Sequence, residues 1–337
     1  MTTVLENRQG LIDHLHELHD QLQFALLEAL RNADRNANMD HLSYVADVRG
    51  GDTIYAIDMI AEHIIDDYCL AWSLQEGPIV LVSEGVEGAG WKVFPQGARE
   101  EDARFLLLFD PIDGTRNLMV NKRSSWALSG IAPNLGRQTT LKDIEVAMMT
   151  ELPTSRALLA DCLWAIAGEG AHRLTRNLHD RTEHTAGIHP STEVDLSHGF
   201  SSIAKFFPPA KAAMAAFEEQ LFLEVAPNPG ENPLVFDDQY MTTGGQLYEL
   251  MIGHDRFTAD LRPIFFAKLG LDAKLVCHPY DICVELIARE AGVIVVDDCG
   301  NQLDTLCDIR AGVSWCGYAN QAIYDRVHPA LERLLHA

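Results

Sequence analysis

The residues most able to do chemistry form a compact acidic stretch, DPIDGT, at residues 110–115. Asp110 and Asp113 flank the backbone carbonyl of Ile112, so one short and stiff segment offers several oxygen donors. Such donors suit Mg²⁺, which takes oxygen ligands in near-octahedral array at about 2.0–2.1 Å. The N–H groups after Gly114 would offer a phosphate cradle where a helix begins. The segment therefore predicts a divalent-metal site next to a phosphate.

Three more carboxylates stand at the ends or starts of expected elements. Glu84 follows a short apolar strand, residues 79–82, and Asp281 precedes an apolar helix, residues 282–291. Asp58 falls on the apolar face of a helix, where a carboxylate is costly unless it is paired or binds a metal. For Asp58 a local hydrogen bond or salt bridge is an equally good explanation.

In this order the motifs resemble those of the inositol monophosphatase family, within the superfamily that includes the fructose-1,6-bisphosphatases. The family's DPxDGTxN motif is intact at residues 110–117. The family's upstream acidic motif has a counterpart at Glu84, and its helical acidic pair has one at Asp58 with Glu62. Its aromatic–Asp helix start corresponds to Tyr280-Asp281, and its glycine turn corresponds to Glu290-Ala291-Gly292. The similarity extends from about residue 45 to 300, and the series of motifs is far more specific than any one of them.

The resemblance implies a site for two or three Mg²⁺ ions. Glu84, Asp110 and the carbonyl of Ile112 are similar to the ligands of the first ion. Asp110, Asp113 and Asp281 are similar to those of the second. Two such ions, about 3.5–4 Å apart, would activate a water and stabilise the leaving oxygen.

The resemblance also implies catalytic and substrate contacts. Thr115, paired with Asp58, is similar to the dyad that orients and helps deprotonate the attacking water, and Glu84 counts with these catalytic groups. The residues expected to contact substrate are Asp113, Gly114, Thr115 and Asp281.

Some positions depart from the family's pattern. Gly85 replaces the second acidic residue of the usual Glu-Glu pair, Tyr280 replaces a Trp, and Val293 replaces the last glycine of the turn. The family's basic residue before the Asp58 helix has its nearest equivalent in Arg49. The segment from about 180 to 275 is longer than a minimal member needs. Because relatives place substrate-contacting residues in this region, the identity of the substrate stays open. The turn at Gly244-Gly245 could line a sugar pocket or simply start a helix.

The implied reaction is Mg²⁺-dependent hydrolysis of a phosphate on a polyol or sugar, with inositol monophosphate as the leading candidate. Fructose-1,6-bisphosphate and a 3′-phosphonucleotide are the alternatives within the class. The basic residues that could bind a second phosphate are loosely placed, at Arg256, Arg262, Lys268 and Lys274. A catalytically silent relative that binds a metal or ligand ranks behind, because Asp58, Asp113 and Thr115 are all present.

The elements that must position these residues follow from periodicity. Continuous apolar runs predict buried strands at 79–82 and 105–109, and alternation predicts antiparallel strands over 130–170. The expected helices span about 10–34, 53–70, 244–251 and 282–291. A turn with a cap at Asp52 or Thr53 precedes the second helix, and a strand at 293–296 follows the last one. The segment at 180–232 is less regular. Together they predict a layered αβαβα sandwich, with an α+β half at 1–224, an α/β half at 225–337, and the site between them.

Composition narrows the partners. The chain has 337 residues and a formal charge of −23, which disfavours nucleic acid and anionic membranes. No apolar run is long enough to span a bilayer and the N-terminus is polar, so we expect a soluble cytoplasmic protein. The seven cysteines form no CxxC pair and are expected to be buried free thiols, and His14, His16 and His19 to lie on a solvated helix face. Dimers are frequent among relatives, which leaves a homodimer open.

Overall fold

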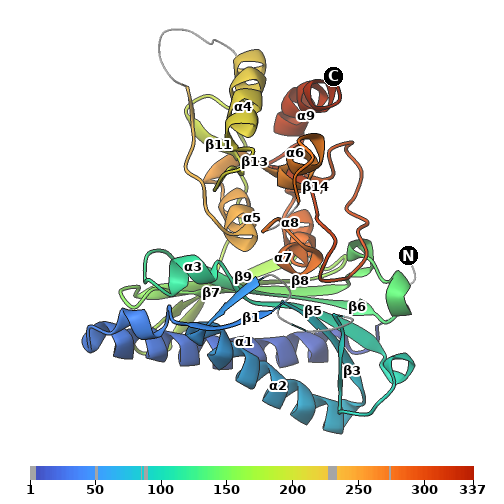
Figure 1. The fold of residues 1–337 in the computed structure, drawn as a ribbon. Helices are drawn as coiled ribbons and strands as arrows, with labels where there is room; N and C mark the ends of the chain where they lie inside the picture. The colour runs from blue at the N-terminus through green and yellow to red at the C-terminus, as the bar shows by residue number, and fades with distance from the viewer. Residues whose placement is uncertain (1–4, 50–51, 85, 87–89, 227–233, 273–274) are drawn as a thin grey trace.

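The computed structural model describes residues 5–49, 52–84, 86, 90–226, 234–272 and 275–337 (Figure 1). Helices and sheets alternate in five layers within this part of the chain. The predicted αβαβα sandwich is therefore confirmed.

The first layer is a pair of helices, α1 (Arg8–Arg35) and α2 (Ala56–Glu76), which pack on each other and against one face of the larger sheet (Figure 1). The leucines at steps of three and four in α1 are buried, as the predicted helix requires. The N-cap of α2 is Tyr55, so the predicted cap at Asp52 or Thr53 is wrong. Both residues lie in a strand, β2 (Asp52–Tyr55), which pairs with β1 (Val45–Arg49); Gly50 and Gly51 lie outside the described residues.

In the described part of the chain the larger sheet has eight strands, in the order β10-β9-β8-β7-β6-β5-β3-β4. Their bounds are β3 (Ile79–Ser83), β4 (Lys92–Phe94), β5 (Phe105–Asp113), β6 (Ser125–Pro133), β7 (Val146–Leu152), β8 (Leu159–Ile166), β9 (Ala171–Asn177) and β10 (Glu183–Ala186). Only β3 and β5 pair in parallel, so the prediction of a mostly antiparallel sheet is confirmed. Every residue of β5 is buried because both faces of the sheet are covered by helices.

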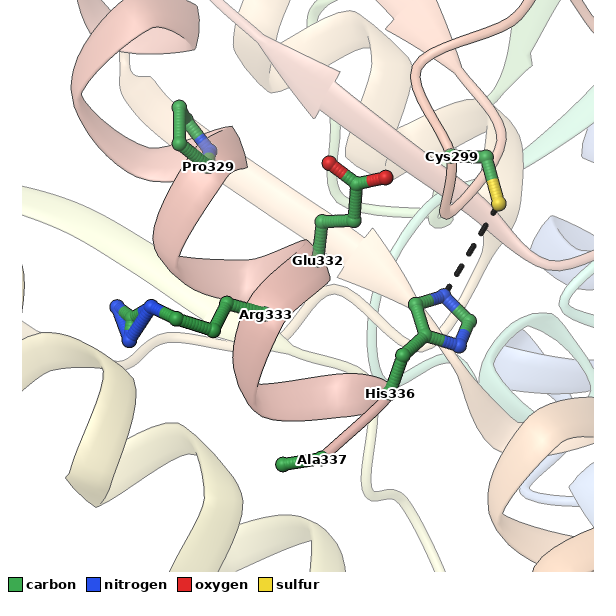
Figure 2. A pocket seen from close by; sticks show the side chains of 6 residues that line it. All are labelled: Cys299, Pro329, Glu332, Arg333, His336 and Ala337. Carbon is green, nitrogen blue, oxygen red and sulfur yellow. Dashed lines mark hydrogen bonds between the residues drawn. The ribbon is translucent and has the colours of Figure 1, made fainter.

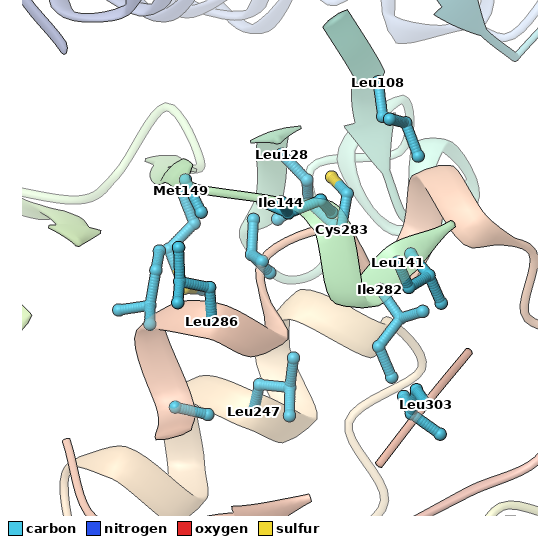
Figure 3. Packing of buried hydrophobic residues seen from close by; sticks show 14 of the residues in the cluster. Leu108, Leu128, Leu141, Ile144, Met149, Leu247, Ile282, Cys283, Leu286 and Leu303 are labelled. Carbon is cyan, nitrogen blue, oxygen red and sulfur yellow. The ribbon is translucent and has the colours of Figure 1, made fainter. Parts of the chain in front are cut away.

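The middle layer holds α5 (Thr243–Met251), α7 (Pro279–Ile282) and α8 (Glu285–Glu290). These helices pack on the second face of the larger sheet. Figure 3 shows Leu128 and Met149 of that sheet beside Ile282, Leu286 and Leu247 of the helices. The largest core cluster therefore joins the N-terminal sheet to C-terminal helices, and it fixes how Asp281 approaches β5.

The second sheet has the order β12-β11-β13-β15-β14 among the described residues. Its strands are β11 (Gly199–Ile203), β12 (Val235–Phe236), β13 (Asp255–Asp260), β14 (Ile294–Val296) and β15 (Trp315–Tyr318). Helices α4 (Lys211–Val225), α6 (Arg262–Lys268) and α9 (Gln321–Leu335) complete the last layer (Figure 1). Short helical turns elsewhere are α3 (Thr115–Leu118), η1 (Met39–His41), η2 (Glu100–Asp102), η3 (Gly136–Gln138) and η4 (Leu141–Asp143).

Of the segment at 180–232, the described residues 180–226 are more regular than predicted, because they contain β11 and α4. Met214, Phe217, Leu221 and Val225 recur at helical spacing and are buried in α4, a period that the neighbouring prolines obscured. By sheet membership the chain passes from the first sheet to the second between Ala186 and Gly199. A division into folding units at 224/225 remains a prediction. Among the described residues no helix combines the length and the apolarity needed to cross a membrane.

Candidate active site

The DPIDGT segment forms the end of β5 and a sharp turn into α3. Gly114 has φ of 101°, a left-handed conformation that side chains rarely adopt. A Cβ there would lie 2.3 Å from Cγ2 of Thr242, so the turn also needs glycine to approach the start of α5. The Ser125 hydroxyl donates to the Gly114 carbonyl at 2.8 Å and holds the turn on β6. The turn is thus held from two sides.

Four carboxylates gather at this turn. The side chains of Asp110 and Asp113 are nearly inaccessible, with 2% and 8% of each residue exposed. Burial raises the pKa of Asp110 well above its usual value, and the charges of Glu84, Asp281 and Asp113 raise it further. The pKa of Asp113 is raised first by burial and then by Asp281. The two strand-end residues and the C-terminal Asp281 therefore share one electrostatic environment, although they are far apart in the sequence.

Backbone groups of α5 hold Asp113 in place. The amide N–H of Gly244 donates to Oδ2 of Asp113 at 2.6 Å, and that of Thr243 donates to Oδ1 at 3.3 Å. A Cβ on Gly244 would lie 2.7 Å from Cδ2 of Leu128 and 3.1 Å from Oδ2 of Asp113. Gly244 thus starts a helix and permits a close backbone approach to the carboxylate. The sequence predicts the helix start but not the contact with Asp113. The two consecutive glycines at 244–245 were the signal that could have indicated a close backbone approach.

Asp58 and Thr115 form a direct pair. The Thr115 hydroxyl lies 3.0 Å from Oδ1 of Asp58 and 3.1 Å from the Ile112 carbonyl oxygen, and it can donate to either. The other oxygen of Asp58 accepts the N–H of Tyr55 at 2.8 Å. Asp58 therefore accepts a local hydrogen bond at the start of its own helix and also reaches the Thr115 hydroxyl, while a catalytic role for this pair remains a prediction.

Asp281 sits in α7, where the N–H of His278 donates to its Oδ2 at 2.6 Å. The nearby glycine-turn motif has a structural contact: Glu290 accepts the N–H groups of Gly168 and Gly170 at 2.8 and 2.9 Å. Glu290 thereby ties the β8–β9 turn to α8. The segment around Gly168 is a plain turn between β8 and β9.

The cysteines and histidines depart from expectation at two places. Six cysteines are buried free thiols as predicted, but Cys299 is exposed. His19 is fully buried, where its ring nitrogens meet the hydroxyls of Ser129 and Thr150 at 2.9 and 3.0 Å. The prediction of a solvated face is wrong for His19, because α1 lies across the larger sheet with that face inward.

Comparison with solved structures gives the same overall architecture over nearly the whole chain. Fructose-1,6-bisphosphatase of Leishmania major in its holo form is 15% identical, with a TM-score of 0.66 over 99% of this chain and all of that one. The extragenic suppressor protein SuhB of Bartonella henselae is 17% identical, with a TM-score of 0.62 over 97% and 98%. Inositol monophosphatase from Anabaena is 15% identical, with a TM-score of 0.60 over 98% and 97%. No protein-family model and no curated protein sequence matches.

At this identity the comparisons define the fold. It is the layered fold of solved structures described as fructose-1,6-bisphosphatase and as inositol monophosphatase. The fold is therefore the one that the resemblance of the sequence motifs predicts.

Proposed function

We propose that this protein is a Mg²⁺-dependent phosphatase that hydrolyses a small phosphate monoester on a polyol or sugar. The observation that carries the proposal is the meeting of buried Asp110 and Asp113 with Glu84 and Asp281, beside the Thr115–Asp58 pair. Buried carboxylates repel one another unless positive charge joins them. The pKa of Asp113 is raised by burial and by Asp281, and the charge of Arg262 only partly opposes this rise. The Arg262 guanidinium is itself paired with Asp260 at 2.5 Å. The donor set therefore fits divalent cations.

Glu84, Asp110, the Ile112 carbonyl, Asp113 and Asp281 would hold two or three Mg²⁺ ions. When bound, these ions would acidify the attacking water and offset charge on the phosphoryl group and the departing alkoxide. The chain's own groups do the positioning. N–H donors from α5 and α7 keep Asp113 and Asp281 in one orientation without neutralising them.

Thr115 is the group that handles the proton. While its hydroxyl donates to Asp58, its free lone pairs can accept a hydrogen bond from the attacking water. As the water loses its proton, Thr115 receives it and Asp58 accepts the hydroxyl proton in turn. The Tyr55 N–H keeps Asp58 directed at Thr115 throughout. The backbone N–H groups of Gly114 and Thr115 would bind phosphate oxygens.

The charged side chains favour one phosphate over two. Arg256 donates to the backbone carbonyl of Asp195 at 2.8 Å, and Arg262 is held by Asp260. Lys268 donates to the backbone carbonyl of Leu335, and Lys274 lies outside the described residues. Three candidates for a second phosphate site are thus already engaged. This supports inositol monophosphate or a related sugar monophosphate ahead of fructose-1,6-bisphosphate; a 3′-phosphonucleotide stays an alternative.

The test is a panel of phosphate monoesters with Mg²⁺, read out as released inorganic phosphate. We expect sugar or polyol monophosphates to be hydrolysed, the reaction to stop with a chelator, and added Mg²⁺ to restore it. Absence of hydrolysis across the panel, in protein that binds Mg²⁺, would instead assign a catalytically silent relative.

A further inference from the structure

A second group of ligand-type side chains lies on the outer layer of the C-terminal half. It consists of Asp298, Cys299 and His336, which we call the 298/336 cluster. Nε2 of His336 lies 3.1 Å from Oδ2 of Asp298 and 4.0 Å from Sγ of Cys299. The third side of the triangle, Sγ to Oδ2, is 3.8 Å. One sulfur, one nitrogen and one oxygen donor therefore face a common point.

These separations match the ligand spacing around a tetrahedral ion. With metal–nitrogen and metal–oxygen bonds of about 2.0–2.1 Å and a metal–sulfur bond of about 2.3 Å, ligand atoms lie about 3.3–3.6 Å apart. The observed sides, 3.1 to 4.0 Å, need shifts of about half an ångström, within the reach of a side-chain torsion. A plain ion pair between His336 and Asp298 would not require the thiol to join them.

The two halves of the cluster are held by different elements. Asp297 accepts the N–H groups of Cys299 and Asn301 at 2.9 and 2.8 Å, which shapes the turn after β14. Gly300 in this turn has φ of 80°, and a Cβ there would lie 2.7 Å from the Tyr324 hydroxyl of α9. The turn thus packs against α9, and His336 is the C-cap residue of this helix. Cys299 meets His336 because the fold places them together.

The surroundings favour a cation at an open site. Cys299 and His336 line a surface pocket with Pro329, Glu332, Arg333 and Ala337 (Figure 2). Figure 2 shows Glu332 projecting from α9 into the same pocket, where it adds negative charge. Arg333 points away, and its guanidinium is paired with Glu224. The only exposed cysteine of the seven therefore stands among carboxylates.

We propose that Asp298, Cys299 and His336 form a binding site for a divalent transition metal of the zinc type. Sulfur and imidazole donors select such ions over Mg²⁺, which prefers oxygen. Cys299 binds as a thiolate, so its proton is released to solvent when the metal enters. The site is independent of the carboxylates at β5 and does not depend on the proposed function.

The test uses the full chain, treated with a chelator, desalted and kept reduced. Co²⁺ is titrated in excess Mg²⁺, and the thiolate-to-cobalt charge-transfer absorption is recorded. Carboxylates give no such band, so cobalt at β5 is silent in this readout. We expect one equivalent of Co²⁺ to produce the band and Zn²⁺ to abolish it by displacement.

Two variants and a control decide the outcome. Cys299→Ser should remove the band. His336→Gln should weaken Co²⁺ binding by about 100-fold or more, because loss of a residue that only hydrogen-bonds to a metal ligand already costs about 10–100-fold in affinity. His63→Gln, which changes an exposed histidine of α2, should bind like the wild type. No band in the wild type, or a band that survives Cys299→Ser, would overturn the proposal. Phosphatase activity does not enter this readout, so its absence leaves the result intact.

Discussion

Within the described residues, potential metal ligands gather at two places that differ in burial, donor type and support. At β5 the ligands are oxygens, Asp110 and Asp113 are buried, and backbone N–H groups hold the carboxylates. In the 298/336 cluster the donors are mixed, Cys299 is exposed, and Asp298 and His336 are bound to each other. The first arrangement is suited to hard ions that stay hydrated on one side, the second to softer ions at low coordination number.

The difference shows what burial adds to a cluster of charges. At β5 burial raises the pKa of Asp110 and Asp113, and neighbouring carboxylates raise it further, so the metal-free protein carries unfavourable electrostatic energy there. Folding tolerates this because core contacts between the larger sheet and α5, α7 and α8 bring the groups together anyway. The exposed cluster faces water, which screens its charges. The predictions below test this contrast, beginning with the largest expected effect.

Asp113→Asn should break the β5 site. The change removes one negative charge but keeps an oxygen that can accept the Gly244 N–H. We expect kcat/KM to fall on the order of 10³-fold, about 4 kcal/mol, because the metal ion that would act on the phosphate loses a carboxylate ligand. Without metal, the variant should unfold at a higher temperature than the wild type, because like-charge repulsion is relieved.

Asp66→Asn is the matched control for this change. Asp66 is half exposed and paired with Lys92 at 2.5 Å, so its loss should alter neither the activity nor the metal-free unfolding temperature appreciably. Wild-type activity in Asp113→Asn would show that the buried carboxylates do not form the catalytic site.

Thr115→Ala should separate proton handling from metal binding at the same site. Loss of the hydroxyl removes the hydrogen bond to Asp58 but no carboxylate. We expect kcat to fall about 10²-fold while the Mg²⁺ concentration at half-maximal activity stays within about twofold. Thr115→Ser keeps the hydroxyl and should retain most of the activity. Equal kcat values for the Ala and Ser variants would remove Thr115 from the mechanism.

The strand and turn that carry the DPIDGT segment could be predicted because the information is local, whereas the metal-binding and catalytic roles of these residues remain predictions. Asp110, Ile112, Asp113 and Thr115 lie within six positions, and the apolar run before them indicates a buried strand. The contact of Asp113 with the start of α5 could not be predicted, since it depends on how β5, β6 and α5 pack in three dimensions.

The 298/336 cluster shows the opposite case. Cys299 and His336 are 37 positions apart and carry no spacing signature, so the sequence predicted only buried thiols. The same limit explains His19: helical periodicity identifies an apolar face, but it cannot tell which polar residues at its margin meet hydroxyls across a sheet. It also explains α4, whose weak contrast between faces was obscured by flanking prolines.

Gly244→Ala should show how far the buried site depends on backbone support. The new Cβ would meet Leu128 at 2.7 Å and Asp113 at 3.1 Å, so β6 or α5 must shift. We expect a loss of about 2 kcal/mol in unfolding free energy and weaker Mg²⁺ activation, because Asp113 moves with its donor.

Gly312→Ala is the control at a glycine where the new Cβ makes a milder contact. Its nearest neighbour would be Val276 at 3.3 Å, which needs a shift of only a few tenths of an ångström. Denaturant unfolding with and without Mg²⁺ measures both effects. A Gly244→Ala protein with unchanged Mg²⁺ activation would show that Asp113 does not rely on α5.

His19 tests burial in a polar group that belongs to neither cluster. Burial lowers its pKa from 6.5 to about 3, with a smaller contribution from His16. Between about pH 6.5 and 3, His19 is protonated in the unfolded chain but neutral in the folded chain. Stability is therefore fully present above this range and is lost as the pH falls through it. At pH 5.5 the loss from this residue is about 1.4 kcal/mol.

His19→Gln should therefore flatten the acid side of the stability curve. Its unfolding free energy at pH 7.5 will be lower than that of the wild type, because the contacts with Ser129 and Thr150 are disturbed. Between pH 7.5 and 5.5, however, it should lose about 1.4 kcal/mol less than the wild type, since no buried imidazole remains to be protonated. His63→Gln, at an exposed position, should keep the wild-type slope. If the two variants show the same slope, burial does not control the ionisation of His19, and the electrostatic contrast between buried and exposed groups loses its simplest support.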